Sequence, residues 1–80
     1  MTARVYVSPK KTVLDPQGQT IRAALQGRGY ASVGNVRQGK VFEIEVSGDP
    51  AKARQELEEI ARTILANPVI EEYRVEWPEN

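Results

Sequence analysis

The sequence contains neither cysteine nor histidine. Without cysteine the chain can form no disulfide, offers no thiolate nucleophile and cannot build a zinc-thiolate site. Without histidine it also lacks the commonest general base and metal ligand. These absences count against an enzyme that works through either residue, and they favour a binding or structural role.

An excess of one charge and long apolar runs are also missing. Eleven basic and eleven acidic residues give a formal net charge of zero, so the composition provides no electrostatic footprint for nucleic acid or an anionic membrane. No apolar run approaches the length of a membrane span, and the N-terminal residues lack the apolar region of a signal peptide. The expected location is therefore the cytoplasm.

The clearest element is a helix that begins at Pro50. Asp49 precedes it as an N-cap candidate, and proline suits the first helical position because its missing N–H needs no partner there. The pair Asn67-Pro68 ends the helix. Its apolar residues recur on one face, which predicts a buried stripe. The core residues expected from this stripe are Leu57, Ile60 and Ile64.

A second helix is expected to begin at Asp15-Pro16, which repeats the cap-and-proline pair. Gly27 and Gly29 predict the end of this helix, because glycine is a poor helix former and a good terminator.

Four stretches have the composition or the period of a β-strand. They cover residues 3–8, 32–37, 40–47 and 69–77. Gln38-Gly39 divides the middle two, either as a tight hairpin turn with Gly39 at positive φ or as a bend in one long strand. We favour the hairpin.

The resulting order, β-α-β-β-α-β, predicts a single α+β domain over residues 1–80, a two-layer sandwich of the ferredoxin-like type. A four-stranded antiparallel sheet would carry two helices on one face. The other face would be bare, and with exposed edge strands and so small a core we expect a homo-dimer or a tetramer. The side chains expected on the bare face are Arg4, Tyr6, Glu43, Glu45, Glu72, Arg74 and Glu76.

Paired carboxylates could serve acid-base chemistry or bind a hard cation. Glu43 and Glu45 would share a sheet face, where alternating charge is the usual surface pattern, whereas the adjacent Glu71 and Glu72 would point to opposite faces. We therefore predict no catalytic residue and no metal ligand. Single-stranded RNA binding is also disfavoured, because only Tyr6 is placed to stack a base.

Four motifs along the chain carry a family resemblance. They are VLDPQG at residues 13–18, Ala-Leu and Gly-Tyr at residues 24–30, VRQGK at residues 36–40 with Glu-Ile shortly after it, and LANPVIEEY at residues 65–73. In this order, and over nearly the whole chain, they resemble PurS, the small subunit of phosphoribosylformylglycinamidine synthase.

The resemblance implies a non-catalytic subunit in de novo purine biosynthesis, where formylglycinamide ribonucleotide, glutamine and ATP yield formylglycinamidine ribonucleotide. A PurQ glutaminase would release ammonia and a PurL synthetase would bind ATP and magnesium. The small subunit would bridge the two and assist ammonia transfer. The chain would thus belong to an ATP-dependent C–N ligase complex, with no cofactor of its own.

Candidate partner-binding residues lie within these motifs. They are Asp15, Gln17, Arg37, Gly39, Lys40, Asn67 and Glu71. One departure from the family pattern is Arg28, where we expect an apolar residue. An alternative of another class is a stand-alone regulatory module that binds a small metabolite between subunits. Against it, Pro9-Lys10-Lys11 stands where such a module needs a glycine-rich loop.

Overall fold

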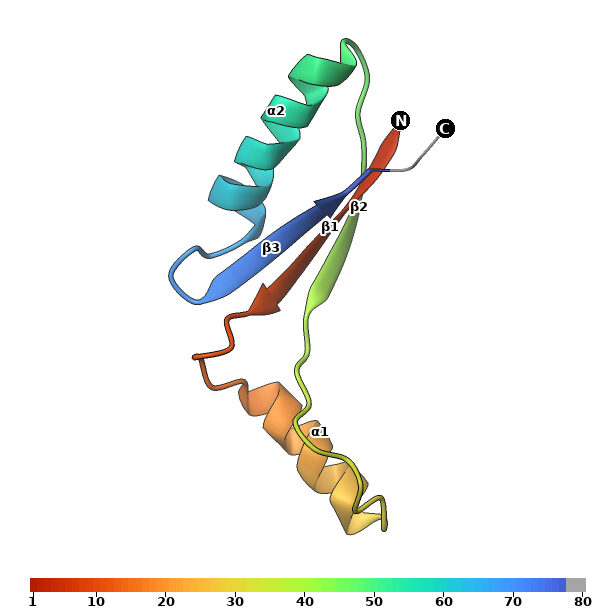
Figure 1. The fold of residues 1–80 in the computed structure, drawn as a ribbon, viewed down its shortest axis with the longest axis vertical. Helices are drawn as coiled ribbons and strands as arrows, with labels where there is room; N and C mark the ends of the chain where they lie inside the picture. The colour runs from red at the N-terminus through yellow and green to blue at the C-terminus, as the bar shows by residue number, and fades with distance from the viewer. Residues whose placement is uncertain (78–80) are drawn as a thin grey trace.

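A computed structural model describes residues 1–77, so residues 78–80 of the expected domain lie outside the described range. Figure 1 shows the three strands and two main helices of that range. The strands are β1 (Thr2–Pro9), β2 (Lys40–Glu45) and β3 (Glu71–Glu76). The helices are α1 (Pro16–Gly27) and α2 (Pro50–Ile60), and a π-helical turn, η1 (Ala61–Leu65), extends α2.

The sheet has the order β2-β1-β3, with β1 antiparallel to both neighbours. Every second side chain of β1 is buried, as the period of a strand predicts: Ala3, Val5 and Val7. These side chains pack beneath α2, whose Leu57 is fully buried. The core is therefore one face of the sheet covered by one helix.

The opposite face of the sheet carries the mixed charges expected of it. The register places Arg4 between Glu43 and Glu76, and Tyr6 opposite Arg74. Glu76 accepts a hydrogen bond from the Tyr6 hydroxyl at 3.3 Å and lies 3.6 Å from the Arg74 guanidinium. These exposed groups largely neutralise one another, so they add little to stability.

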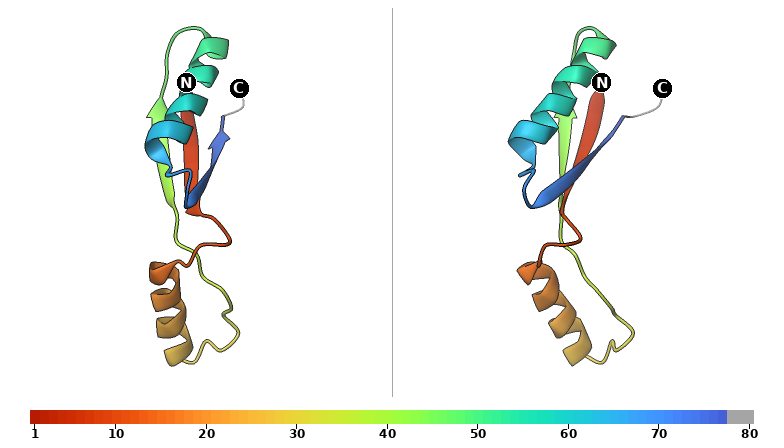
Figure 2. Two further views of the ribbon diagram at one scale, coloured as in Figure 1. Left: turned by 90° about the vertical axis from the view of Figure 1, so that its left-hand side faces the viewer. Right: turned by 60° about the vertical axis from the view of Figure 1, so that its left-hand side comes forward.

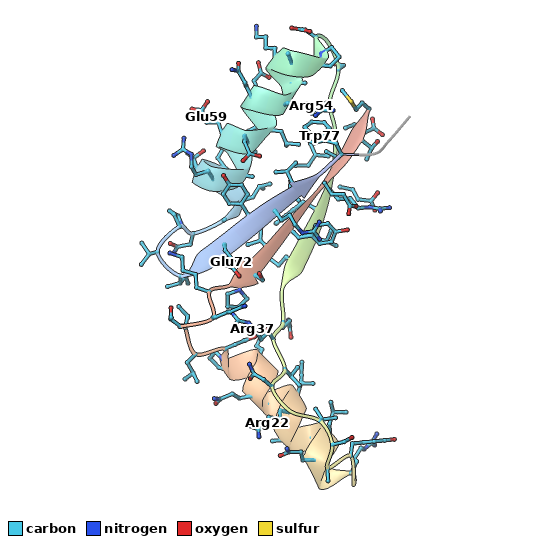
Figure 3. All side chains as sticks on the ribbon, viewed as in Figure 1. Arg22, Arg37, Arg54, Glu59, Glu72 and Trp77 are labelled. Atoms are coloured by element: carbon cyan, nitrogen blue, oxygen red, sulfur yellow. The ribbon has the colours of Figure 1, made fainter. Side chains whose placement is uncertain are left out.

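Two side-chain contacts join α2 to β3 and to the residue that follows it. The Tyr73 hydroxyl donates to a Glu58 carboxylate oxygen at 3.2 Å. The Arg54 guanidinium lies 5.2 Å from the centre of the Trp77 ring, within the range of a cation-π contact (Figure 3). These two contacts therefore help to hold α2 against the sheet.

The expectation of two helices on one sheet face is wrong for a single chain. α1 lies beyond the end of the sheet, opposite the end at which β1 begins, in all three views (Figures 1 and 2). The returning segment stays beside α1, because buried Gly18 lets the Val36 carbonyl approach the helix closely and the Gln26 amide donates to the Val33 carbonyl at 3.1 Å. We call residues 16–39 the arm.

The fourth strand and the hairpin are absent from residues 1–77, because the chain runs from the arm directly into β2. Residues 32–37 pair with α1 instead of with the sheet. Gly39 does not take the positive φ of a tight turn, whereas Gly29 and Gly48 both do, at 95°. Gly39 is required for a different reason, since a Cβ there would lie 2.6 Å from the Val7 carbonyl oxygen.

The turn η1 corrects one predicted core residue. The Ala66 N–H donates to the Ala61 carbonyl at 3.0 Å, five residues back, which inserts one residue relative to an α-helical turn. The insertion rotates the following residues, so Ile64 is 74% exposed and Ala66 is buried in its place. Leu57 is confirmed as core, and Ile60 is half-buried.

The molecule is long and thin, with principal extents of 51 × 29 × 13 Å. Its radius of gyration is 16.1 Å. A compact domain of this length would have about 12 Å. The difference comes from the arm, which extends the molecule without adding to the core.

Candidate partner interface

The seven candidate residues gather at one end of the sheet, where β1 ends and the arm begins. Asp15 lies just before the arm, and Arg37 and Gly39 lie at its end, directly before β2. Glu71 lies opposite Pro9 in the register of β1 and β3. Lys10 donates its backbone N–H to the Ile70 carbonyl at 2.9 Å, which places the turn before β3 beside the same junction. We call this end of the sheet the junction.

Asp15 tethers the returning segment to the start of α1. Its carboxylate accepts the Gln38 backbone N–H at 2.7 Å. The expected side-chain cap hydrogen bond is not formed, although α1 begins at Pro16 as predicted. This N–H lowers the pKa of Asp15 most, followed by the Gly18 amide; desolvation opposes the shift, and the Gln17 amide and the Arg37 charge add to it.

Arg37 and Gly39 also have structural tasks at the junction. The half-buried Arg37 guanidinium donates to the Pro9 carbonyl, and so holds the end of β1 against the returning segment (Figure 3). Gly39 lets that segment pass over Val7 and Ser8 of β1. Lys40 is exposed at the first position of β2. Lys40 is therefore a charged side chain at the junction that is accessible to a partner.

Asn67 and Glu71 close the turn between η1 and β3 on each other. A Glu71 carboxylate oxygen accepts the Asn67 N–H at 2.7 Å, and the Asn67 carbonyl accepts the Glu71 N–H at 2.7 Å. The Asn67 side-chain oxygen also accepts the Val69 N–H at 3.0 Å. The motif at residues 65–73 therefore builds a rigid turn.

Three exposed apolar side chains border the junction, and sequence reasoning did not select them. Val69 is 76% exposed, Leu14 66% and Ile70 44%. Their signal was available in the sequence, because apolar residues at a proline-bounded turn or beside an N-cap have no core position to fill. Gln17, the remaining candidate, is exposed one turn into α1 and lines a shallow hollow with Ile21 and Gln38.

The junction presents exposed apolar side chains beside hydrogen-bonded polar groups. Within residues 1–77 there is no group of three acidic, histidine or cysteine side chains that could hold a metal ion. Several of its polar groups are engaged by the backbone, and its exposed groups include the apolar side chains of Leu14, Val69 and Ile70 and the side chain of Lys40. Such a mixture of exposed apolar and charged groups on a fixed frame is typical of a protein interface. Among the described helices, none is long and apolar enough to cross a membrane.

Comparison with known proteins gives the same assignment. The family model of PurS, phosphoribosylformylglycinamidine (FGAM) synthase, matches residues 2–79. The phosphoribosylformylglycinamidine synthase subunit PurS of Mycobacterium leprae is 44% identical, over 91% of this chain and 90% of its own length.

Solved structures extend the similarity to the whole shape. A crystal structure of PurS from B. subtilis superimposes with a TM-score of 0.88 at 40% identity, covering 98% of both chains, the arm included. A chain of the structure described as PurLQS from Thermotoga maritima gives a TM-score of 0.82 at 32% identity, covering 92% of both chains. The chain therefore belongs to the PurS family, whose members are subunits of phosphoribosylformylglycinamidine synthase.

Proposed function

We propose that the chain is the non-catalytic bridging subunit of a phosphoribosylformylglycinamidine synthase in de novo purine biosynthesis. The complex would convert formylglycinamide ribonucleotide, glutamine and ATP to formylglycinamidine ribonucleotide. The observation that carries the proposal is the family match over residues 2–79, which spans the three strands, both helices and the junction.

The partners proposed are a PurQ-type glutaminase and a PurL-type synthetase, which the name of the Thermotoga maritima complex supports. With no cysteine and no histidine on this chain, the glutaminase must supply the nucleophile that attacks glutamine. ATP and magnesium are assigned to the synthetase, and the work of this chain is to hold the two larger subunits together and assist ammonia transfer. The cytoplasm is the proposed location.

The shape supports both bridging and self-association. A molecule 51 Å long with exposed apolar side chains at its junction can reach two partners at once. Its bare sheet face, its edge strands and its uncovered α1 favour a homo-dimer or a tetramer, because a single chain of this size buries too little apolar area to be very stable. The junction, with Asp15, Gln17 and Lys40 on one side and the turn at Asn67–Glu71 on the other, is the proposed contact surface for a larger subunit.

The experiment is to add the purified chain to the two larger subunits and to measure synthesis from glutamine and from free ammonia in parallel. Glutamine-dependent synthesis should rise more than ammonia-dependent synthesis, because a bridge couples two sites and does not change the chemistry at either. The chain alone should neither hydrolyse glutamine nor turn over ATP. Equal stimulation from both ammonia sources would contradict the bridging role and would indicate activation of the synthetase.

A further inference from the structure

A small polar hollow lies between the segment that leaves β1 and the segment that returns from the arm. Its volume is about 120 Å³. Side chains from residues 11–15 line one side, side chains from residues 35–37 line the other, and Gln19 of α1 completes the lining. The hydrogen bond from the Gln38 N–H to Asp15 holds the two segments together, so the two sides of the hollow are fixed relative to each other.

Two cationic side chains belong to this hollow. Lys11 is exposed and Arg37 is half-buried, between the end of β1 and the start of α1 (Figure 3). The two ion pairs within residues 1–77 involve neither side chain. Arg37 donates to the Pro9 carbonyl through one of its terminal nitrogens, and a guanidinium has five N–H donors, so most of its donors remain for a ligand. The hollow therefore offers two positively charged donors.

Asp15 adds one negative charge to the same hollow. The Gln38 and Gly18 amides lower its pKa, so the carboxylate is ionised at neutral pH. A carboxylate has about four acceptor sites, so Asp15 can accept a further donor besides these amides. A ligand with negative charge alone would be repelled by Asp15, whereas a ligand that carries both charges would match all three groups.

The size of the hollow limits the ligand. A cavity of roughly 150 Å³ holds one benzene molecule, so this hollow admits a group of about five non-hydrogen atoms and is too small for a nucleotide. The head group of an α-amino acid has this size, and it carries a carboxylate and an ammonium on one carbon. Val13, Leu14 and Val36 provide apolar surface beside the charged groups.

We propose that this hollow binds a free α-amino acid. The ligand carboxylate is held by Lys11 and Arg37, and the ligand ammonium is held by Asp15. The exposed side-chain amides of Gln19 and Asn35 supply further hydrogen bonds. A bound molecule contacts both segments at once, so it fixes the arm relative to the sheet. The inference goes beyond the proposed function, because the bridging role requires no small ligand on this chain.

An NMR titration of the full chain tests the site and locates it. Glycine and glutamine are the probes, and each should shift the backbone amide signals of Lys11 and Asn35 in a saturable way. Acetate and methylammonium each carry only one of the two charges. They should bind roughly tenfold more weakly than glycine or less, because each leaves part of the charge in the hollow unmatched.

Two neighbouring lysines provide a matched pair of variants. Lys11→Gln removes a charge that lines the hollow, whereas Lys10→Gln removes one that does not. Lys11→Gln should weaken glycine binding by roughly fivefold, as expected for one exposed charge pair, and Lys10→Gln should change it by less than about twofold. Both variants should keep the melting temperature of the unliganded protein, because neither side chain makes a hydrogen bond or an ion pair within residues 1–77.

Three results would overturn the inference. The first is the absence of a saturable shift with both glycine and glutamine. The second is acetate binding as tightly as glycine, which would indicate a site for any small anion. The third is an equal loss of binding in the two lysine variants, which would place the ligand elsewhere. Failure of the bridging role would appear in synthesis with the larger subunits and would leave this titration unchanged.

Discussion

The backbone N–H of Gln38 donates to the side chain of Asp15 at 2.7 Å, across 23 residues of sequence. Asp15 directly precedes the arm and Gln38 lies near its end, so this bond joins the two segments at the base of the arm, and we call it the clasp. The carboxylate, which the sequence assigns to a local task at the start of α1, therefore also has a long-range one.

The clasp should depend on pH. The Gln38 N–H and the neighbouring amides lower the pKa of Asp15 below 3.8, its ordinary value, so the folded protein prefers the ionised carboxylate. A group of this kind stabilises the fold above its unfolded pKa, and the contribution is lost as the pH falls through the lower folded value. Asp15→Asn should therefore be less stable than the natural protein near neutral pH, and the two urea midpoints should converge as the pH falls through the lowered folded pKa of Asp15. A constant difference at all pH values would contradict this account.

Gly39 and Gly34 form a matched pair for testing the crossing at the junction. A Cβ at Gly39 would lie 2.6 Å from the Val7 carbonyl oxygen, whereas a Cβ at Gly34 would have no neighbour within 4 Å, and neither residue has a positive φ. Gly39→Ala should cost about 1 to 3 kcal/mol, because backbone atoms must move to accept the methyl group. Gly34→Ala should be neutral or slightly stabilising. Similar denaturation midpoints for the two variants would show that the segments do not cross so closely.

Leu57 and Ile64 differ sharply in exposure although both belong to the apolar stripe of one helix. Leu57 is fully buried and Ile64 is 74% exposed. Leu57→Ala should cost about 2 to 5 kcal/mol in the stability of the fold. Ile64→Ala should open no cavity in the protomer and should act mainly on self-association. Urea unfolding over a range of protein concentrations separates these effects, and a larger loss for Ile64→Ala at every concentration would refute the position of the π turn.

Arg37 and Lys40 should respond differently to the same substitution. Arg37→Gln removes the guanidinium that donates to the Pro9 carbonyl, so it should lower the melting temperature as well as weaken assembly. Lys40→Gln changes an exposed side chain, so the fold should keep its stability within about half a kcal/mol while assembly with the larger subunits weakens. Full glutamine-dependent synthesis with Lys40→Gln at limiting concentration would leave this lysine as an ordinary surface charge.

The elements with a strong local signal were predictable from the sequence. The proline after Asp49 and the apolar period that follows it predict α2, and the alternation in residues 3–8 and 40–47 predicts β1 and β2, the second of which ends at Glu45. The destination of α1 was not predictable in this way, because the same apolar stripe can cover the sheet of its own chain or the surface of another. The strand predicted over residues 32–37 is wrong for a related reason. Whether an extended segment joins a sheet depends on partners that are distant in the sequence.

The candidate site shows the same division. The resemblance located its residues, and the structure shows that several of them support the surface as well as line it. Asn67 and Glu71 bind each other, and Arg37 binds the end of β1. The Arg37 contact is contained in no local pattern, because it joins residues 28 apart in the sequence, whereas the Asn67–Glu71 contact lies within one turn. The exposed side chains of Leu14 and Val69 are the part of the site that attention to misplaced apolar residues could have found.

The π turn determines which side chains after α2 are buried and which are exposed. One added residue in η1 shifts the phase of the helix by about 100°, so Ile64 within the turn is exposed and Ala66 just after it is buried. In an uninterrupted α-helix Ile64 would lie about two turns after buried Leu57, on the face toward the sheet. Less apolar surface would then be exposed beside α2. Deleting or inserting one residue in this turn should therefore move apolar side chains between the core and the surface. The phase of this one turn therefore sets how much apolar surface the domain exposes for contact with another molecule.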